Sequence, residues 1–266
     1  MTVSDAAPKR ALVTGAARRL GRAMALALAE RGYDLAIHYA GSRDEAEATV
    51  AEIEAMGRKA VAVQADLLVE AEAETLVARA ATALGGPLTL LVNNASIFEY
   101  DTLASATRDS WDRHIGSNLR APFVLMQRFA AQAPAALRDD AGEPVAQAMV
   151  VNMIDQRVFK LTPEFMTYTI AKMGLWALTR TAAQALAPDI RVNAIGPGPT
   201  LRGARQSEKH FADQRAATIL ERGADPSDIV AALRYFLEAR SVTGQILCVD
   251  GGQHLVWRTE DVLGVE

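Results

Sequence analysis

Short apolar runs alternate along this chain with longer segments in which apolar residues recur every three or four positions. Runs of the first kind predict buried β-strands, and recurrence of the second kind predicts amphipathic helices. Strands that alternate with helices favour an α/β fold with a parallel sheet and right-handed crossovers. Seven strands are expected, in the runs RALVT from Arg10, DLAIHYA from Asp34, KAVAVQADL from Lys59, LTLLVNNAS from Leu88, QAMVVNMI from Gln147, IRVNAI from Ile190 and QILCVD from Gln245.

The segments between these runs predict helices. Helical patterns begin near Leu20, Ser42 and Val69, a long one extends over about 107–133, one lies within 151–180, and one begins at Asp225. The segment at about 199–223 turns polar and charged, and we expect a lid over the substrate there, with a plain surface insertion as the alternative. No linker interrupts the pattern, so residues 1–266 are expected to form a single domain.

The first strand ends in a turn that suits an anion. Gly15 and Gly21 bracket this turn, which leads directly into the first predicted helix. A tight turn at a helix N-terminus directs backbone N–H groups to one point, where a pyrophosphate can bind. The turn is not a Walker loop, because Arg22 and Ala23 follow the second glycine where Lys and Ser or Thr are needed. Glycines required only for packing are the alternative explanation.

The end of the second strand indicates the type of dinucleotide. It lacks the acidic residue that binds the 2′-hydroxyl of NAD, and it offers His38, Tyr39, Ser42 and Arg43 instead. Arg18 and Arg19 lie across the turn, and guanidinium groups match the geometry of a 2′-phosphate. We therefore expect NADPH (NADP+) as the cofactor in preference to NADH, although Arg43 also fits the start of a solvated helix.

Polar residues or glycines follow four of the predicted strands. Gly15, Asp66, Asn94 and Asp155 each stand at the carboxyl end of a strand. In an open parallel sheet the ligand crevice lies outside these ends, so the four residues are expected along one rim. Asn and Asp are also common in turns for local reasons, and it is their joint occurrence that indicates a binding crevice.

Tyr168 and Lys172 are the expected acid–base pair. They are four residues apart in a helical segment, so their side chains leave the same face of one helix. An ammonium group beside a phenol favours the phenolate, so Lys172 is expected to lower the pKa of Tyr168 toward the range of general acid catalysis. Asp155 stands thirteen residues earlier and could line the same cleft. An ionised Asp155 near Tyr168 would raise that pKa and oppose Lys172, and the distances between the groups decide which effect is larger. A surface tyrosine and a solvated lysine are the alternative.

Asn118 lies inside the long predicted helix, four residues before Pro122. Proline has no N–H group, so the main-chain oxygen of Asn118 loses its helical partner. An ordered water bound there could resupply protons to Tyr168 through Lys172. A kink whose free oxygen is bonded elsewhere is the alternative.

Composition narrows the classes of function. The net charge is −4, and no stripe of Lys and Arg indicates nucleic acid as a partner. No apolar stretch reaches the length of a membrane span, and no signal peptide is evident, so we expect a cytoplasmic protein without a membrane partner. A single cysteine, Cys248, rules out an internal disulfide, and the four scattered histidines predict no metal site.

The chain resembles the short-chain dehydrogenase/reductase family over essentially its whole length. The resemblance is carried by Thr14-Gly15 with Gly21, Asp66-Leu67, Asn93-Asn94-Ala95, Asn118, Tyr168 with Lys172, Pro197-Gly198 and Asp250-Gly251-Gly252. It implies a Rossmann-type, doubly wound, seven-stranded sheet and a nicotinamide cofactor. It also implies that Tyr168 is the general acid, that Lys172 binds the nicotinamide ribose, and that Asn118 belongs to the proton relay.

The same resemblance extends the cofactor-binding set and implies a small-molecule substrate. The set comprises Gly15, Arg18, Arg19, Leu20, Gly21, Tyr39, Ser42, Asp66, Leu67, Asn94, Ala95, Ser96, Tyr168, Lys172, Pro197 and Gly198. A homotetramer is expected from the family. The apolar tail residues Leu255, Val256 and Trp257 lack partners nearby in sequence, and we expect them at a subunit interface.

Two departures from the common family pattern point to the pteridine reductase branch. Arg19 stands where the family usually has glycine, and Asp155 stands where it usually has serine. The branch implies that a pterin ring stacks on Phe98 and meets Asp155, Tyr168 and Arg19. A serine donates to a ketone oxygen, whereas an ionised carboxylate only accepts, so Asp155 suits a substrate with N–H groups. Gly41 departs from the branch, which often has a basic residue there.

These observations lead to three hypotheses. The first is an NADPH-dependent reductase of a pterin or folate that uses Tyr168 as proton donor. The second keeps the cofactor and the tyrosine but reduces a carbonyl of unknown identity. The third is a non-catalytic NADP-binding regulator, against which the intact set of Tyr168, Lys172 and Asn118 argues.

Overall fold

The computed structural model of the chain describes residues 7–203 and 206–257. Its centre is a seven-stranded parallel sheet with the strand order β3-β2-β1-β4-β7-β8-β9. These strands are β1 (Arg10–Val13), β2 (Asp34–Tyr39), β3 (Ala60–Gln64), β4 (Leu90–Asn93), β7 (Ala148–Met153), β8 (Ile190–Pro197) and β9 (Ile246–Val249). Each lies within one of the seven predicted runs or extends its end, and the order reverses between β1 and β4. The prediction of a doubly wound, Rossmann-type sheet is therefore confirmed.

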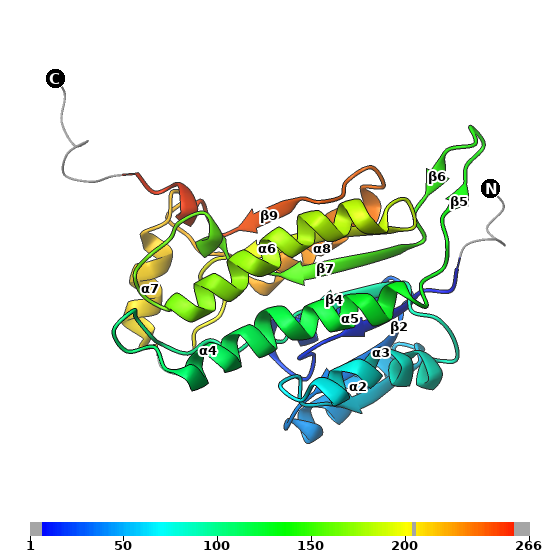
Figure 1. Cartoon of the computed structure of the whole chain (residues 1–266), viewed down its shortest axis with the longest axis horizontal. Helices are drawn as coiled ribbons and strands as arrows, with labels where there is room; N and C mark the ends of the chain where they lie inside the picture. The colour runs from blue at the N-terminus through cyan, green and yellow to red at the C-terminus, as the bar shows by residue number, and fades with distance from the viewer. Residues whose placement is uncertain (1–6, 204–205, 258–266) are drawn as a thin grey trace.

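Helices cover both faces of the sheet (Figure 1). They are α1 (Arg19–Glu30), α2 (Arg43–Ala55), α3 (Glu70–Leu84), α4 (Arg108–Ile115), the π-helix η1 (Gly116–Arg120), α5 (Ala121–Ala130), α6 (Met166–Leu186), α7 (Glu208–Ala216) and α8 (Pro226–Glu238). Two 3-10 turns, η2 (Gln156–Val158) and η3 (Gln253–Leu255), complete the set within the described residues.

The side chains of each strand point alternately to the two faces of the sheet, and a hydrophobic layer covers each face. Ala11 and Val13 of β1 pack with α1, α2 and α8, whereas Leu12 packs with α3, α5 and the C-terminal part of α6. Successive side chains of a strand point to opposite faces, so one short apolar run contributes to both layers. The continuous apolar character of the runs follows from this burial on two sides.

The predicted long helix over 107–133 differs from the observed structure. It divides into α4, η1 and α5, and α5 ends at Ala130. In η1 the backbone N–H of Ala121 donates to the carbonyl of Gly116, five residues earlier. Such a turn inserts one extra residue into the helix, and it lies at the residues just before Pro122, which cannot donate. The expected disturbance of the helix at Asn118 is thus a π-helical turn.

One element was not predicted from the sequence, and the predicted lid is partly helical. A hairpin of β5 (Leu137–Arg138) and β6 (Pro144–Val145) follows α5 and projects at the end of the molecule opposite α7 (Figure 1). The lid segment 199–223 contains α7 and two residues, 204–205, that lie outside the described part of the chain. Asp225 is the N-cap residue of α8, as predicted, and its backbone N–H donates to the Asp228 carboxylate over 2.8 Å.

Candidate active site

The helix α6 and the end of β7 bring the predicted acid–base residues together. Tyr168 and Lys172 lie one turn apart on α6, and Asp155 follows β7 by two residues. The Tyr168 hydroxyl donates to Asp155 Oδ2 over 2.9 Å, and Lys172 Nζ donates to the Met153 carbonyl over 2.8 Å. Tyr168 and Lys172 are both buried. Residues far apart in the sequence thus form one polar cluster at the carboxyl end of the sheet.

Burial and Asp155, and not Lys172, set the acidity of Tyr168. Burial raises the pKa of Tyr168 well above its ordinary value, and the neighbouring Asp155 carboxylate raises it further. Burial likewise raises the pKa of Asp155, and burial lowers the pKa of Lys172 to about 8. The carboxylate wins because it contacts the phenol directly, whereas the ammonium is bonded to a backbone carbonyl and lies 5.6 Å from the centre of the ring.

Aromatic rings border this cluster. The Phe98 ring stacks on Phe165 at 4.2 Å between centroids and meets Tyr168 edge-on at 4.7 Å. Phe98 is 46% exposed, so a large part of it remains open to a ligand. A hydrogen bond from Ser96 acts to lower the pKa of Tyr168, against the larger effects of burial and Asp155. The three residues predicted for substrate contact on this side, Phe98, Asp155 and Tyr168, are therefore neighbours.

Asn118 is linked to the same region through its side chain. Its Oδ1 accepts from the backbone N–H of Ile97 over 2.9 Å, and its Nδ2 donates to the carbonyl of Ile97 over 2.8 Å. The side chain is fully buried, and a primary amide matches both groups of one peptide residue. The described contacts of Asn118 therefore hold the loop after β4, and the proposed relay through its main-chain oxygen remains a prediction.

The predicted dinucleotide turn has the geometry that a pyrophosphate needs. Gly15 has a φ of +61°, and a Cβ atom added at Gly21 would lie 2.3 Å from the carbonyl oxygen of Gly15. At the N-terminus of α1, the N-cap residue Arg18 makes no side-chain capping bond. The first N–H groups of this helix, in the region of Leu20, are therefore available to an anion, and the residues present fit a nucleotide phosphate.

His38, which the sequence places with the residues that suit a 2′-phosphate, is buried and supports the glycine turn instead. The backbone N–H of Gly15 donates to His38 Nδ1 over 3.0 Å, and Nε2 bonds the carbonyl of Ala65 over 3.0 Å. Since Nδ1 accepts, the proton is on Nε2. Burial lowers the pKa of His38 to about 4, which keeps the ring neutral at pH 7. One buried imidazole thus joins the glycine turn to the ends of β2 and β3.

Arg18 and Arg19 lie in different surroundings. Arg18 lies 3.5 Å from the Glu45 carboxylate at the start of α2. The guanidinium of Arg19 donates instead to the carbonyls of Arg202 and Leu201, over 3.0 and 3.1 Å, in the predicted lid segment. Arg19 also has a φ of +55°, a left-handed conformation that favours glycine. This explains why glycine is the usual residue at this position of the turn.

The other residues predicted for the 2′-phosphate corner lie around the start of α2, and their contact with a 2′-phosphate remains a prediction. Arg43 donates from Nε to the Tyr39 hydroxyl over 3.3 Å and lies 3.7 Å from Glu47. Ser42 is the N-cap residue of α2 and makes no side-chain capping bond. Arg18 and Arg43 supply two guanidinium groups near the end of β2, and Tyr39 and Ser42 supply two hydroxyl groups.

The remaining predicted cofactor residues lie along the carboxyl edge of the sheet. Asn94 Nδ2 donates to the carbonyls of Thr14 and Gly15 over 2.8 and 3.2 Å, and the backbone N–H of Ala95 donates to the Thr14 hydroxyl over 2.9 Å. Asp66 Oδ1 accepts from the backbone N–H of Leu68 over 2.9 Å. Pro197 ends β8, and Gly198 lies so close to Asp250 that an added Cβ atom would lie 2.5 Å from the Cβ atom of that residue.

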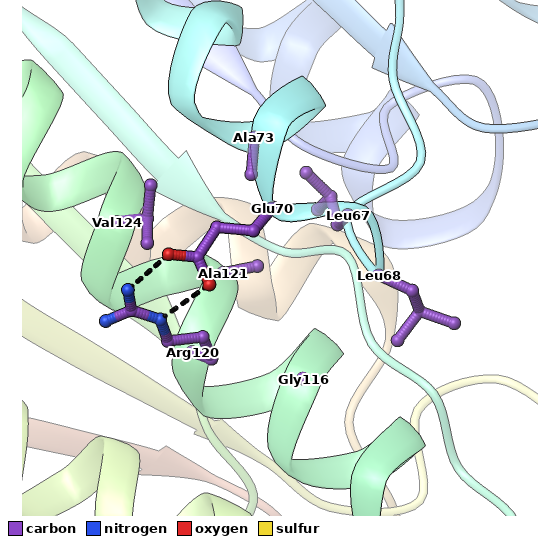
Figure 2. A pocket seen from close by; sticks show the side chains of 8 residues that line it. All are labelled: Leu67, Leu68, Glu70, Ala73, Gly116, Arg120, Ala121 and Val124. Atoms are coloured by element: carbon purple, nitrogen blue, oxygen red, sulfur yellow. Dashed lines mark hydrogen bonds and ion pairs between the residues drawn. The ribbon is translucent and has the colours of Figure 1, made fainter.

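Leu67 lines a cavity away from the tyrosine. The cavity has a volume of ≈ 40 Å³ and lies between the start of α3 and the η1–α5 segment, where the carboxylate of Glu70 pairs with Arg120 (Figure 2). Its lining is mostly apolar, and its size suits at most one or two water molecules. It offers no room for a nucleotide or a pterin.

A metal site and a membrane-spanning helix each require features that the described residues lack. Among residues 7–203 and 206–257, no group of three or more His, Cys, Asp or Glu side chains could hold a metal ion. Within the same ranges, no helix has both the length and the apolar character needed to span a membrane.

The fold agrees with comparisons to known proteins. The chain matches, over residues 15–254, a family model described as enoyl-(acyl carrier protein) reductase. It is 34% identical over 252 residues to the 3-oxoacyl-(acyl-carrier-protein) reductase FabG of Staphylococcus epidermidis, and the match covers 93% of this chain and 99% of that protein. The chain therefore belongs to the short-chain dehydrogenase/reductase family of oxidoreductases.

Two solved structures are similar at higher identity. The FolM alternative dihydrofolate reductase 1 of Brucella canis, complexed with NADP, is 44% identical with a TM-score of 0.88, and the match covers 96% of this chain and 97% of that one. The corresponding protein of Brucella suis, also in complex with NADP, has the same identity and TM-score, with 96% and 98% covered. The NADP in both structures agrees with the predicted cofactor.

The contact between Asp155 and Tyr168 generates a pH prediction. Replacing Asp155 by Asn removes the negative charge that raises the pKa of Tyr168 and supports that of Lys172. Both pKa values then fall, so the alkaline limb of the kcat/KM profile is expected to move to lower pH. Steady-state rates between pH 6 and 10 measure this shift. An unchanged alkaline limb, or one that moves to higher pH, contradicts the assigned coupling.

Proposed function

We propose that this protein is an NADPH-dependent reductase that adds hydride to a C=N bond of a pterin or folate, with Tyr168 as proton donor. The observation that carries the proposal is the hydrogen bond from the Tyr168 hydroxyl to Asp155, at 2.9 Å. It pairs Tyr168, the potential acid, with a carboxylate at position 155, where the family usually has a serine that can donate a hydrogen bond.

The carboxylate decides which substrates the site favours. An ionised Asp155 only accepts hydrogen bonds, and it repels the negative charge that develops on a ketone oxygen during reduction. A pterin presents N–H groups and a basic ring nitrogen on the same heterocycle. Its N–H groups can donate to Asp155 while the ring nitrogen accepts from Tyr168. The site thus matches a nitrogen heterocycle better than a simple carbonyl compound.

The chemical step requires one hydride and one proton. Bound NADPH supplies the hydride to the carbon of the C=N bond. Tyr168 donates its proton to the nitrogen, and its raised pKa keeps it protonated before the step. The ammonium of Lys172 lies 5.6 Å from the centre of the Tyr168 ring, where its positive charge favours the developing phenolate, and we propose that it also binds the nicotinamide ribose. Asn118 and Lys172 then return a proton from solvent.

The exposed ring of Phe98, which we call the aromatic wall, and the similar proteins provide further support. Phe98 is half exposed beside Tyr168 and can stack on a planar heterocycle. The structures of 44% identity belong to proteins named alternative dihydrofolate reductases. Arg19 joins the glycine turn to the 199–223 segment through Leu201 and Arg202, which supports the role of that segment as a lid over the substrate.

A carbonyl reductase is the second candidate, because FabG relatives match nearly the whole chain. The two functions make opposite demands on residue 155. If the substrate is a ketone, Asp155→Ser restores the usual donor and raises turnover. If the substrate is a pterin, the same change removes the acceptor for its N–H groups and lowers turnover.

The substrate assignment is tested by NADPH oxidation. We expect turnover of dihydrobiopterin, dihydromonapterin or dihydrofolate, and Tyr168→Phe should lower kcat by about 10²- to 10⁴-fold because the proton donor is lost. Tyr235→Phe, at a half-exposed tyrosine of α8, is the matched control and should retain activity. Reduction of an acetoacetyl thioester without reduction of any pterin would refute the assignment in favour of the second candidate.

The cofactor preference is tested at Arg18. Arg18→Ala removes a guanidinium group from the proposed 2′-phosphate corner, and loss of one charged hydrogen bond corresponds to about a tenfold weaker NADPH affinity. NADH affinity should change little, because NADH lacks that phosphate. Cofactor fluorescence titrations measure both constants, with the exposed Arg240→Ala as control. Equal weakening for both cofactors contradicts a contact to the 2′-phosphate.

We further propose a homotetramer. Trp111, Phe123, Ile170 and Met173 are large apolar residues on α4, α5 and α6, between 37% and 42% exposed, and these helices lie side by side (Figure 1). Leu255 and Trp257, the last part of the predicted interface tail within the described residues, are more than half exposed. Residues 258–266 lie outside the described part.

Analytical ultracentrifugation tests the assembly. The wild-type protein is expected to sediment as four 28.5 kDa chains. The double variant Ile170→Lys and Met173→Lys adds charge to the proposed interface and should yield smaller species. A wild-type monomer at micromolar concentration rules the tetramer out.

A further inference from the structure

The loop that follows β4 is anchored at three places between residues 97 and 101. Asn118 bonds both backbone groups of Ile97. The backbone N–H of Glu99 donates to His114 Nε2 over 3.1 Å. Asp101 accepts from the backbone N–H of Thr167 over 3.1 Å. The exposed ring of Phe98 therefore lies on a loop whose backbone is tied to α4, η1 and α6.

The N-terminus of α6 depends on this loop. Its N-cap residue, Phe165, has a left-handed backbone with φ of 53° and makes no side-chain capping bond. Asp101 takes over this role, since its carbonyl accepts from the N–H of Met166 over 3.4 Å and its carboxylate from that of Thr167. A negative group is favourable at this end of a helix. Tyr168 is the next residue along α6.

The side chains of Asp101, Thr167 and His114 form a directed chain of hydrogen bonds. The Thr167 hydroxyl donates to the Asp101 carboxylate, so it must accept from His114 Nδ1, which lies 2.7 Å away. The proton of the neutral imidazole is then on Nδ1, and Nε2 is free to accept from Glu99. Burial lowers the pKa of His114, which maintains this neutral form.

We infer that Asp101, Thr167 and His114 are positioning residues, which set the distance and orientation between the aromatic wall at Phe98 and the acid Tyr168. The inference rests on the proposed function for the nature of the substrate ring. All three side chains are at most 2% exposed, although apolar residues would fill the same space at a lower desolvation cost. Directional bonds, in contrast to apolar contacts, specify one relative placement of loop and helix. The feature that requires this placement is the edge-on pair of Phe98 and Tyr168.

A matched pair of variants at Thr167 tests the inference. Thr167→Val preserves the side-chain volume but removes the hydroxyl, whereas Thr167→Ser keeps the hydroxyl. We expect Thr167→Val to raise KM for the dihydropterin by about tenfold, the equivalent of one charged hydrogen bond, while the NADPH affinity changes little. Thr167→Ser should restore KM to near the wild-type value. An unchanged KM in Thr167→Val overturns the inference.

A double-variant cycle separates positioning from general destabilisation. If the chain of hydrogen bonds acts through the ring of Phe98, then Thr167→Val should have little further effect on KM in a Phe98→Ala background. An equal effect in both backgrounds contradicts the inference. If Thr167→Val does not give folded protein, Asp101→Asn replaces it in the same cycle, with the same expected and contradicting results.

A crystal structure of each Thr167 variant with NADP bound gives a readout that needs no turnover. Phe98 should leave its stacked position on Phe165 in Thr167→Val and keep it in Thr167→Ser. An unmoved Phe98 in Thr167→Val overturns the inference. Failure of the pterin assignment in the oxidation assay leaves this structural result unaffected, so the two proposals fail independently.

Discussion

The hydrogen bond from Tyr168 to Asp155 is the constraint on which the site depends. It joins α6 to the end of β7, and it exists only because the sheet delivers residue 155 to the same edge as the start of α6. Burial and this contact with the carboxylate together raise the pKa of Tyr168, so the phenol is a weaker acid than free tyrosine. The reaction must therefore supply a strong proton acceptor or additional positive charge at the moment of transfer. A ring nitrogen that gains electrons from a hydride is such an acceptor.

Polar groups with a supporting role surround this pair. His38 ties the glycine turn to two neighbouring strands, and Asn118 ties the loop after β4 to the π-helical turn. Each uses both hydrogen-bonding ends of one buried side chain: His38 joins Gly15 to Ala65, and Asn118 holds both backbone groups of Ile97. Buried groups satisfied in this way make the position of a segment specific, and they leave no orphaned donor to weaken it. Different buried side chains therefore hold the two parts of the site. His38 holds the glycine turn, and Asn118 holds the loop that carries Phe98.

Much of the fold followed from local pattern, and much of the site did not. The seven strands were predictable because each is a short apolar run buried on both faces, and α2 and α3 because their apolar residues repeat at helical spacing. The hairpin β5–β6 was missed, since strands of two residues carry no periodic signal. The π-helical turn was anticipated only as a disturbance before Pro122. Element type depends on neighbours in sequence, which is why these predictions held.

The chemistry of the site depends on neighbours in space. The proximity of Asp155 and Tyr168 was expected, but the sign of the net pKa shift needed the distances, because burial and the carboxylate oppose the ammonium. His114 and Thr167 gave no signal, since a histidine and a threonine in helical segments have no partner until the fold brings Asp101 beside them. Arg19 was recognised as unusual, but its bonds to Leu201 and Arg202 join residues more than 180 positions apart.

The central claim is that the carboxylate of Asp155 and the hydroxyl of Tyr168 together receive a nitrogen heterocycle. The most direct measurement is a crystal structure of the protein with NADP+ and 7,8-dihydrobiopterin. The account predicts a ring stacked on Phe98, with N–H groups directed at Asp155 and a ring nitrogen within hydrogen-bond distance of the Tyr168 hydroxyl. A pterin bound with Asp155 facing only carbon or carbonyl oxygen atoms, or bound outside this crevice, would contradict it.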